Sequence, residues 1–445
     1  MATEVLKTKA EQELAQQFET DMPNLPGSDV GWTKAMREAA WQTYAAAGLP
    51  HRRVEEWKYT DLRALLKDAY PPAPALGEAL TAENIDAALG EHVAALDCHR
   101  IVIVNGHFRE ELSDLDGIGA QVEVHSLSEA LSAPSDWLQN TLGQVAPQDG
   151  DVIASLNAAL MTGGVIVRVA EEAKIEKPLH LIHVAAVKDA AGLATRNIVD
   201  VGADAAVTLL ESYTGHGATP VQRNAVTELV AGDKADVHHI KLQNDNAQTA
   251  HLSTWMTRLG TRASYRAFQF STGADVARNQ IFAHFAGKGG LSHVSGAVLS
   301  RGKQHDDTTM VIDHAVPECE SREFFKLVLD DDARGIVQCK VNVQRDAQKS
   351  DGHQIAHGLM LSETAEFDSK PELEIFADDV VCGHGSTSGQ VDEDLLFYLR
   401  ARGIPEPQAR ALLIEAFIGE ALEKIERDDV REAFSALTSS WLKGE

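Results

Sequence analysis

Between about Val165 and His384, glycines recur at a near-constant interval and separate short strand-like segments. Gly202, Gly232, Gly260 and Gly287 lie 30, 28 and 27 residues apart, and each begins a small or polar turn that leads into a strand-like run. A near-fixed period of this length is typical of a solenoid, in which each repeat covers the apolar face of its neighbour. An antiparallel meander with irregular loops explains the spacing about equally well. The residues alone therefore leave a parallel β-helix and a meander open.

One repeat shows the alternation expected of a strand. Ile240 and Leu242 alternate with His239, Lys241 and Gln243. This period of two indicates a strand with one buried face, and we expect the isoleucine and the leucine to point into the core.

Helical patterns flank the strand-rich region. Trp32 and Met36 fall on one face of an expected helix that ends at Gly48, and the Thr60 hydroxyl is expected to cap a short helix with buried leucines at positions 62, 65 and 66. We expect four regions, which are a helical region (1–68), a mixed α/β connector (69–150), a strand-rich core (151–390) and a C-terminal helical region (391–445).

The C-terminal region carries three apolar stripes at helical spacing. They comprise Leu395, Leu396 and Leu399, then Ala409, Leu412, Leu413, Ala416 and Phe417, and finally Val430, Phe434, Leu437 and Trp441. Stripes of this kind usually form core, although a helical tail at the end of a β-helix can keep part of its surface for a partner.

The composition excludes several classes of protein. The chain has 445 residues with 67 acidic and 40 basic side chains, a formal net charge of −27, and only four cysteines. This balance argues against a primary nucleic-acid binder, which needs clustered lysine and arginine. No window approaches the ~20 apolar residues of a membrane span, and the first residues lack the apolar run of a secretory signal. We therefore expect a cytoplasmic protein that binds neither nucleic acid nor membrane.

The sharpest local cluster of reactive side chains is Cys382 with His384. On an extended strand, residues i and i+2 point to the same face, so a thiol and an imidazole are expected side by side. Thiolate and imidazole suit soft or borderline metals such as iron. Two ligands do not make a metal site, so the remaining ligands must come from elsewhere in the chain or from a second chain.

Paired carboxylates offer an alternative function. Asp306-Asp307 and Asp378-Asp379 have the residue types that a carbohydrate-active β-helix enzyme uses for acid–base chemistry. Aromatic residues make up only 6% of the chain, which is few for a groove that stacks sugars. We expect Asp306 and Asp307 to be polar residues on the outer face of a solenoid coil. The other cysteines, Cys98, Cys319 and Cys339, are expected to be packing residues.

Several stretches resemble the signatures of one known family. In chain order they are Arg53–Arg63, Asp313–Pro317, Glu320–Arg322, Lys370–Ile375, Ala377–Thr387, Gly389–Asp392 and Leu396–Leu399. They follow the order found in SufD, a family of scaffold subunits in the SUF machinery for iron–sulfur cluster assembly. The paralogous SufB family carries an E-G-C run after a Ser-Tyr pair, whereas this chain has no cysteine in Glu211–Gly215. The resemblance is therefore to SufD.

The resemblance implies a mainly β fold, a right-handed parallel β-helix flanked by N-terminal and C-terminal helices. It also implies a non-catalytic scaffold that pairs with SufB along the β-helix and docks the ATPase SufC. The docking residues expected in the C-terminal helices are Leu395, Leu396, Leu399, Leu412, Leu413 and Phe417. No permanently bound cofactor is implied. An iron–sulfur cluster or iron is held transiently at the SufB–SufD interface, with His384 as the implied ligand and Cys382 as its neighbouring family cysteine.

The chain departs from the family pattern at two places. Phe325–Leu329 stands where a Tyr-Lys-Gly run is usual, and Cys339 occupies a position usually held by glycine. We interpret Cys339 as a larger inward-pointing side chain, and its role stays open. The resemblance also leaves open whether the isolated chain forms a homodimer, whether a flavin binds the complex, and whether iron delivery, sulfur transfer or architecture is the main contribution.

Overall fold

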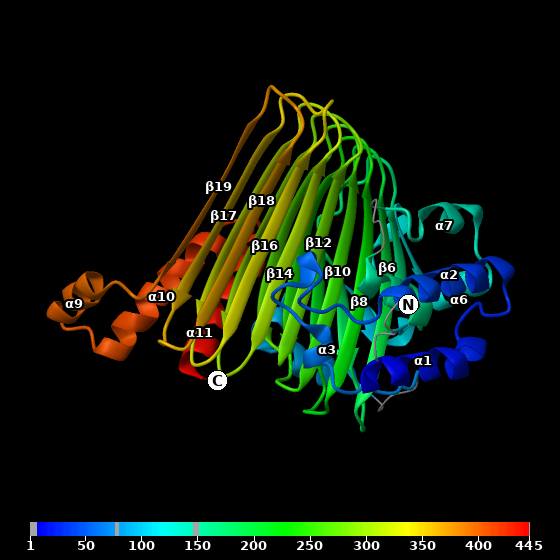
Figure 1. Ribbon diagram of the computed structural model, residues 1–445, viewed down its shortest axis with the longest axis horizontal. Coiled ribbons are helices and arrows are strands. Elements are labelled where there is room, and N and C mark those ends of the chain that lie inside the picture. The colour runs from blue at the N-terminus through cyan, green and yellow to red at the C-terminus, as the bar shows by residue number, and fades with distance from the viewer. Residues whose placement is uncertain (1–6, 76–79, 146–150, 445) are drawn as a thin grey trace, which may run out of the picture.

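The chain winds into a solenoid with two long sheets whose core strands run parallel (Figure 1). The computed structural model describes residues 7–75, 80–145 and 151–444. In the described residues, one sheet has the strand order β19-β17-β15-β13-β11-β9-β7-β5-β1-β2 and the other β18-β16-β14-β12-β10-β8-β6-β4-β3. Successive core strands alternate between the sheets, as the coils of a β-helix require. The expected parallel β-helix with flanking helices is confirmed.

The strands of the described residues are mostly about ten residues long in the core of the solenoid. They are β1 (His99–Val104), β2 (His107–Phe108), β3 (Val122–Ser126), β4 (Val165–Val169), β5 (Leu179–Ala185), β6 (Ala191–Val201), β7 (Ala206–Gly215), β8 (Val221–Ala231), β9 (Asp236–Asp245), β10 (Thr249–Leu259), β11 (Ser264–Gly273), β12 (Val276–Phe285), β13 (Leu291–Ser300), β14 (His305–His314), β15 (Glu320–Leu329), β16 (Arg334–Val343), β17 (Asp351–Met360), β18 (Glu366–Ile375) and β19 (Val381–Gly389).

The helices lie in the regions that flank these strands. They are α1 (Lys9–Asp21), α2 (Gly31–Ala47), α3 (Leu62–Leu65), α4 (Ala82–Leu89), α5 (Glu91–Ala94), α6 (Leu127–Ser132), α7 (Asp136–Thr141), α8 (Val152–Leu160), α9 (Glu393–Ala401), α10 (Glu406–Leu422) and α11 (Asp428–Lys443). The expected four-region division stays a prediction, and its residues 1–6, 76–79, 146–150 and 445 lie outside the described part. Three strands of the expected connector belong to the sheets. β1 and β2 lie at the end of one sheet, and β3 lies at the end of the other.

The recurring glycines mark turns that stack directly on one another. A Cβ at Gly232 would lie 2.8 Å from the backbone nitrogen of Ala203 in the preceding coil, and one at Gly287 would lie 2.1 Å from that of Thr261. Only glycine fits such an approach without moving the backbone. The parallel register also repeats at this period, because Asp236 pairs with Ala206 on one side and with Ser264 on the other. The glycine spacing therefore measures the length of one coil.

The expectation of a single buried face on β9 is wrong. Ile240 and Leu242 face outward and pack under the C-terminal helices, whereas His239, Lys241 and Gln243 face the interior of the solenoid. All five side chains are buried. The alternation is real, but the strand has two buried faces because a helical layer covers its outside.

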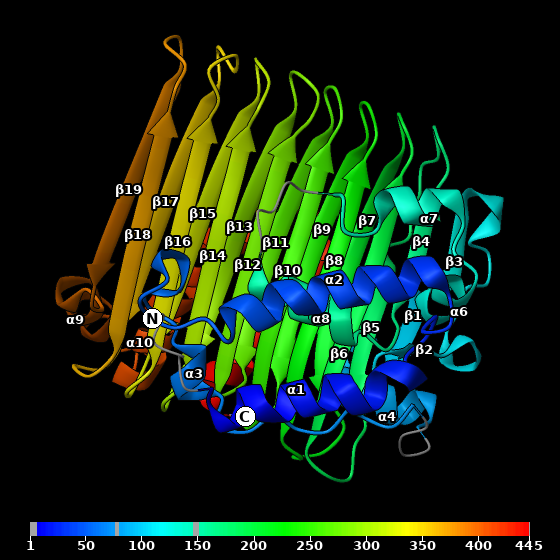
Figure 2. The same ribbon diagram turned by 45° about the vertical axis from the view of Figure 1, so that its right-hand side comes forward.

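Two helical layers cover the two sheets. The helices α1, α2 and α8 lie over the outer face of the sheet that contains β6, β8, β10 and β12 (Figure 2), and α10 and α11 pack on the other sheet, where Phe434 meets Phe270. α2 ends before Gly48, as predicted. The predicted cap of α3 is wrong, because Asp61 caps this helix and the Thr60 hydroxyl bonds elsewhere. Leu62 is buried as expected, whereas Leu65 is exposed.

Candidate functional site: the open end of the solenoid

The last coil of the solenoid ends without a cap. In the described residues, β19 pairs only with β17 and β18 only with β16. Side chains that an additional coil would bury are therefore exposed or half-buried on these two strands. We call this end, formed by β18 and β19, the rim.

Cys382 and His384 lie together on the rim strand β19. Their Cα partners on β17 are Gly352 and Gln354, so the two side chains share one face of the strand, as predicted. Cys382 packs against the interior apolar cluster, whereas His384 is exposed. Burial raises the pKa of the Cys382 thiol, and the backbone N–H of Gly352 opposes this shift. The rim thus presents an accessible imidazole beside a partly covered thiol.

The rim pair by itself does not complete the coordination of a metal ion. Among the described residues, no group of three or more histidine, cysteine, aspartate or glutamate side chains is arranged to hold a metal ion. Two protein ligands leave a tetrahedral ion with half its coordination unfilled.

Several large apolar side chains near the rim are exposed to solvent. Val381 is 62 % exposed and Phe376 is 61 % exposed, and Ile355 and Ile375 are partly exposed beside them. Sequence patterns did not identify these residues, since they occur at the ends of ordinary strands. A cluster of exposed large apolar side chains marks a surface that buries itself against a partner.

The motif Arg53–Arg63 forms a strap across the outside of the β18 sheet. We call Glu55–Thr60 the N-terminal strap, and Figure 2 shows this segment over the sheet near β14 and β16. Arg278 of β12 donates a 2.8 Å hydrogen bond to the Glu56 carbonyl, and Lys370 of β18 donates a 2.6 Å bond to the Glu55 carboxylate. The strap therefore reaches from the middle of the sheet to its rim strand, a contact that local sequence patterns do not reveal.

The Asp306-Asp307 pair is split between two faces of β14. Asp306 points into the interior, where the Ser271 hydroxyl donates to it, and burial raises its pKa to about 7. Asp307 points outward beneath the strap and accepts hydrogen bonds from Arg278 and Thr60. The two carboxyls cannot act on one substrate. Asp307 lies on the outer face, as expected, although it is buried, whereas the expectation is wrong for Asp306, which faces the interior. Asp378-Asp379 lies exposed in the turn before β19.

Four predicted C-terminal docking residues on α9 and α10 differ in their surroundings. Leu395 and Leu412 are exposed, Leu399 is partly exposed, and Leu396 is 1 % exposed and packs inside the described chain. The other two, Leu413 and Phe417, pack partly against the β-helix, where the Lys326 ammonium lies 4.2 Å from the Phe417 ring centre.

The sequence interpretation missed Phe397 and Tyr398 on α9, which are more exposed than any of the six predicted docking residues. α9 projects beyond the strands at the rim end (Figure 1).

The other three cysteines are buried, as expected of packing residues. Cys339 lies in the interior apolar cluster, and burial raises its pKa well above the ordinary value. Burial raises the pKa of Cys98 to about 11, and it also raises that of Cys319. Of the four cysteines, only Cys382 is partly exposed.

A buried polar network fills the middle of the solenoid. His239 bonds to Glu211 at 3.1 Å, and the Lys241 ammonium donates to His251 at 3.0 Å and to Asn279 at 2.7 Å. Burial lowers the pKa of Lys241 to about 7, although nearby carboxylates oppose this. In the sequence, these residues are the polar members of alternating strands. An alternating pattern is normally interpreted as placing its polar residues in solvent, so it did not reveal the network.

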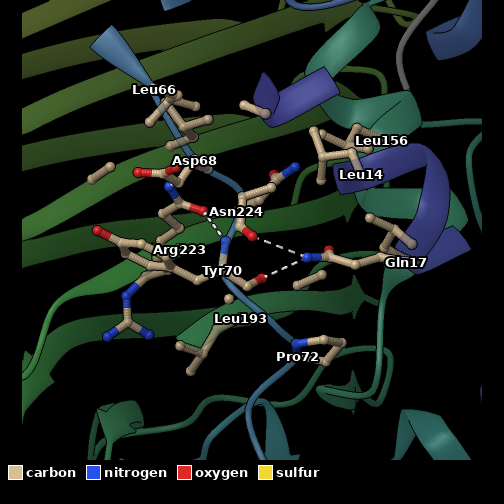
Figure 3. A pocket seen from close by; sticks show the side chains of 18 of the residues that line it. Leu14, Gln17, Leu66, Asp68, Tyr70, Pro72, Leu156, Leu193, Arg223 and Asn224 are labelled. Atoms are coloured by element: carbon tan, nitrogen blue, oxygen red, sulfur yellow. Dashed lines mark hydrogen bonds between the residues drawn. The ribbon is translucent and has the colours of Figure 1, made fainter. Parts of the chain in front are cut away.

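An apolar pocket opens between α1, the segment after α3, and the outer face of β6 and β8 (Figure 3). The Gln17 side chain donates to the Ala69 and Tyr70 carbonyls at 3.2 and 3.0 Å, and the Tyr70 N–H donates to Gln222 at 2.9 Å. These polar groups join the helix to the sheet. The pocket is therefore a packing seam, and we assign no reaction to it.

None of the helices in the described ranges is long and apolar enough to cross a membrane.

Comparison with known proteins identifies the family. The model of the SufBD core domain of the SUF system for FeS cluster assembly matches residues 183–417, and the model of the SufBD protein N-terminal region matches residues 8–181. An iron–sulfur cluster assembly SufBD family protein of Synechocystis is 31% identical over 403 residues, which are 87% of this chain and 86% of the relative.

Two further relatives cover most of the chain. The iron–sulfur cluster assembly protein SufD of Escherichia coli is 27% identical over 91% of this chain and 92% of its own length. The chloroplastic protein ABCI7 of Arabidopsis thaliana is 24% identical over 94% and 88% of the two chains. The chain therefore belongs to the SufBD family of iron–sulfur cluster assembly proteins and is SufD-like.

Proposed function

We propose that this chain is a non-catalytic scaffold subunit that pairs with a SufB-type paralogue through its rim and contributes His384 to a nascent iron–sulfur cluster. The observation that carries the proposal is the uncapped last coil, where an accessible imidazole and a thiol stand beside an unpaired strand edge. An incomplete ligand set at an incomplete sheet fits a site that a second chain finishes. The cluster is the cargo of this site.

The two rim strands differ in their suitability for pairing. β18 carries Pro371, which has no N–H, and charged side chains such as Lys370 and Glu372, all of which protect an edge from pairing. β19 has the sequence VCGHGSTSG, with no proline and no charged side chain apart from a protonated His384. We therefore propose β19 as the strand that pairs with the partner, and with a second copy of this chain when the partner is missing.

We further propose that α9 and the neighbouring part of α10 dock a SufC-type ATPase. The exposed apolar residues Leu395, Phe397, Tyr398 and Leu412 support this surface. Leu396 is buried and instead stabilises the packing of α9. The expected cytoplasmic location stays a prediction.

The experiment is co-expression with the SufB-type and SufC-type subunits, followed by anaerobic purification and measurement of iron and acid-labile sulfide. His384→Ala should lower cluster content at least tenfold, with subunit composition and thermal unfolding unchanged. His353→Ala is the matched control, because His353 lies on β17 beside the rim, with its Nδ1 3.0 Å from the Asp351 carboxylate. Normal cluster content in His384→Ala would exclude His384 as a ligand.

A purely architectural role makes a different prediction. If the chain only supports its partners, the SufB-type and SufC-type subunits alone should mature clusters as well as the full complex. Turnover of a polysaccharide by the isolated chain would instead support the carbohydrate-active alternative, which the separation of Asp306 from Asp307 disfavours.

A further inference from the structure

A narrow crevice lies between the two sheets, next to the rim. Its lining includes Glu323 of β15, Cys339 of β16, Gln354 of β17, Ser369 of β18 and Gly385 of β19. The enclosed part has room for about one water-sized particle. The crevice therefore suits a single ion or water and excludes a larger organic ligand.

Side-chain oxygens of two polar residues in this crevice have no well-formed hydrogen bond among the described residues. Glu323 is 2 % exposed, and neither of its carboxyl oxygens has a hydrogen-bond partner of good geometry among the described residues. The side-chain oxygen of Gln354 is also without one, while its amide nitrogen donates to the Glu372 carbonyl at 3.1 Å. An unpartnered buried polar group costs about 1–3 kcal/mol, so native structures rarely keep one without a ligand, ion or water.

Glu323 and Cys339 are electrostatic neighbours. The charge of Glu323 raises the pKa of the Cys339 thiol, after the larger effect of burial. Burial likewise raises the pKa of Glu323 to about 8, although the Ser321 hydroxyl opposes it. Both groups are therefore mostly neutral at pH 7 when the crevice holds no cation.

We propose that Glu323, Cys339 and Gln354 form an internal site for one divalent cation of borderline softness, such as ferrous iron or zinc. One carboxylate and one thiolate balance the two positive charges, which is the condition for holding a dication away from water. The amide oxygen of Gln354 supplies a neutral third ligand, and Ser369 or water fills the next position. Thiolate ligation selects against magnesium and calcium, which prefer oxygen ligands.

The site lies directly behind the rim. Glu323, Gln354 and His384 are Cα partners on three neighbouring strands, so the backbones of Glu323 and His384 are about 10 Å apart. The charge of Glu323 also raises the pKa of Cys382, which places the carboxyl within electrostatic reach of both the buried and the rim thiol. Only the use of the cation rests on the proposed function, because binding is a property of the isolated chain.

The test is an anaerobic titration of the purified full-length chain with cobalt(II), a probe whose thiolate complexes absorb in the near ultraviolet. We expect about one equivalent to bind with this absorption. Cys339→Ala should abolish the absorption, and the isosteric Glu323→Gln should weaken binding at least tenfold. Thermal unfolding of the unloaded variants checks that both are folded.

Two matched variants separate this site from the rim and from other thiols. Cys382→Ala removes the rim thiol, and Cys98→Ala removes a buried thiol outside the crevice; both should keep the absorption and the affinity. The inference is overturned if cobalt(II) does not bind, if Glu323→Gln binds normally, or if Cys382→Ala loses the absorption. The last result would locate the cation at the rim and leave the proposed function untouched.

Discussion

The Arg278 guanidinium lies 4.2 Å from the centre of the Trp57 ring and joins the N-terminal strap to the middle of the β-helix. Arg278 also bonds to the Glu56 carbonyl and to Asp307, and both Arg278 and Asp307 are buried. A cation, an aromatic ring and a carboxylate thus meet in a desolvated place, where cation–π attraction and ion pairing are strongest. The strap is held by its centre and reaches the rim strand through Lys370.

Trp57→Ala should lower the free energy of unfolding by about 3–5 kcal/mol, because it removes a buried aromatic ring and uncovers the buried Arg278–Asp307 pair. Urea unfolding of the purified chain measures this change. Lys58→Ala, a substitution of the exposed neighbour, should change stability by less than about 0.5 kcal/mol. Equal effects of the two substitutions would contradict the role of Trp57 in holding the N-terminal strap on the β-helix.

Asp306 should make the protein less stable as pH rises from about 4 to about 7. Its pKa is about 7 in the folded chain against an ordinary value of 3.8, because it is buried. In this window the folded state keeps a proton that the unfolded state has released, so the contribution of Asp306 to stability is greatest below pH 4 and falls by up to ~4 kcal/mol by pH 7.

The isosteric Asp306→Asn should remove the part of the pH dependence that Asp306 causes, and so reduce the difference in stability between low and high pH. Urea unfolding at pH 5 and pH 8 provides the measurement, and Asp378→Asn in an exposed turn is the charge-matched control. An unchanged difference between the two pH values in Asp306→Asn would show that another group causes it.

Cys382 should be the first thiol to react with an alkylating reagent in the native isolated chain. It is the only partly exposed cysteine of the four, and the other three are buried. Mass spectrometry should find one fast adduct in the native chain and four adducts after denaturation. The Cys382→Ala variant should lack the fast adduct, and a fast adduct at Cys339 would contradict its interior position.

Phe397→Asp should abolish co-purification with a SufC-type ATPase while leaving the fold intact, because this side chain is 71 % exposed. The neighbouring Leu396→Ala should instead destabilise the C-terminal region by about 2–5 kcal/mol, since Leu396 is buried. Pull-down and thermal unfolding distinguish the two effects. Normal co-purification of Phe397→Asp would move the docking surface away from α9.

The predictable features were those that repeat or depend on neighbours in the chain. The glycine spacing showed a near-fixed period but left a parallel β-helix and a meander equally open. The period is the length of one coil because stacked turns leave no room for a Cβ, as at Gly287. The i, i+2 spacing of Cys382 and His384 predicted a shared face because strand geometry alone sets it. The end of α2 at Gly48 followed from a local backbone preference.

The tertiary structure decided which face of each strand is the interior and which distant residues meet. Lys241 and Ile240 are both buried. Hydrophobicity therefore could not show which of them faces the interior of the solenoid and which faces the covering helices. Glu323 and Cys339 line one crevice from two different sheets, and Trp57 meets Arg278, which lies far from it in the sequence. Local preferences act over a few residues, whereas these contacts form only when coils stack and helices cover them. The period of the strands could therefore be read from the sequence, but the residues that contact one another were decided by the tertiary structure.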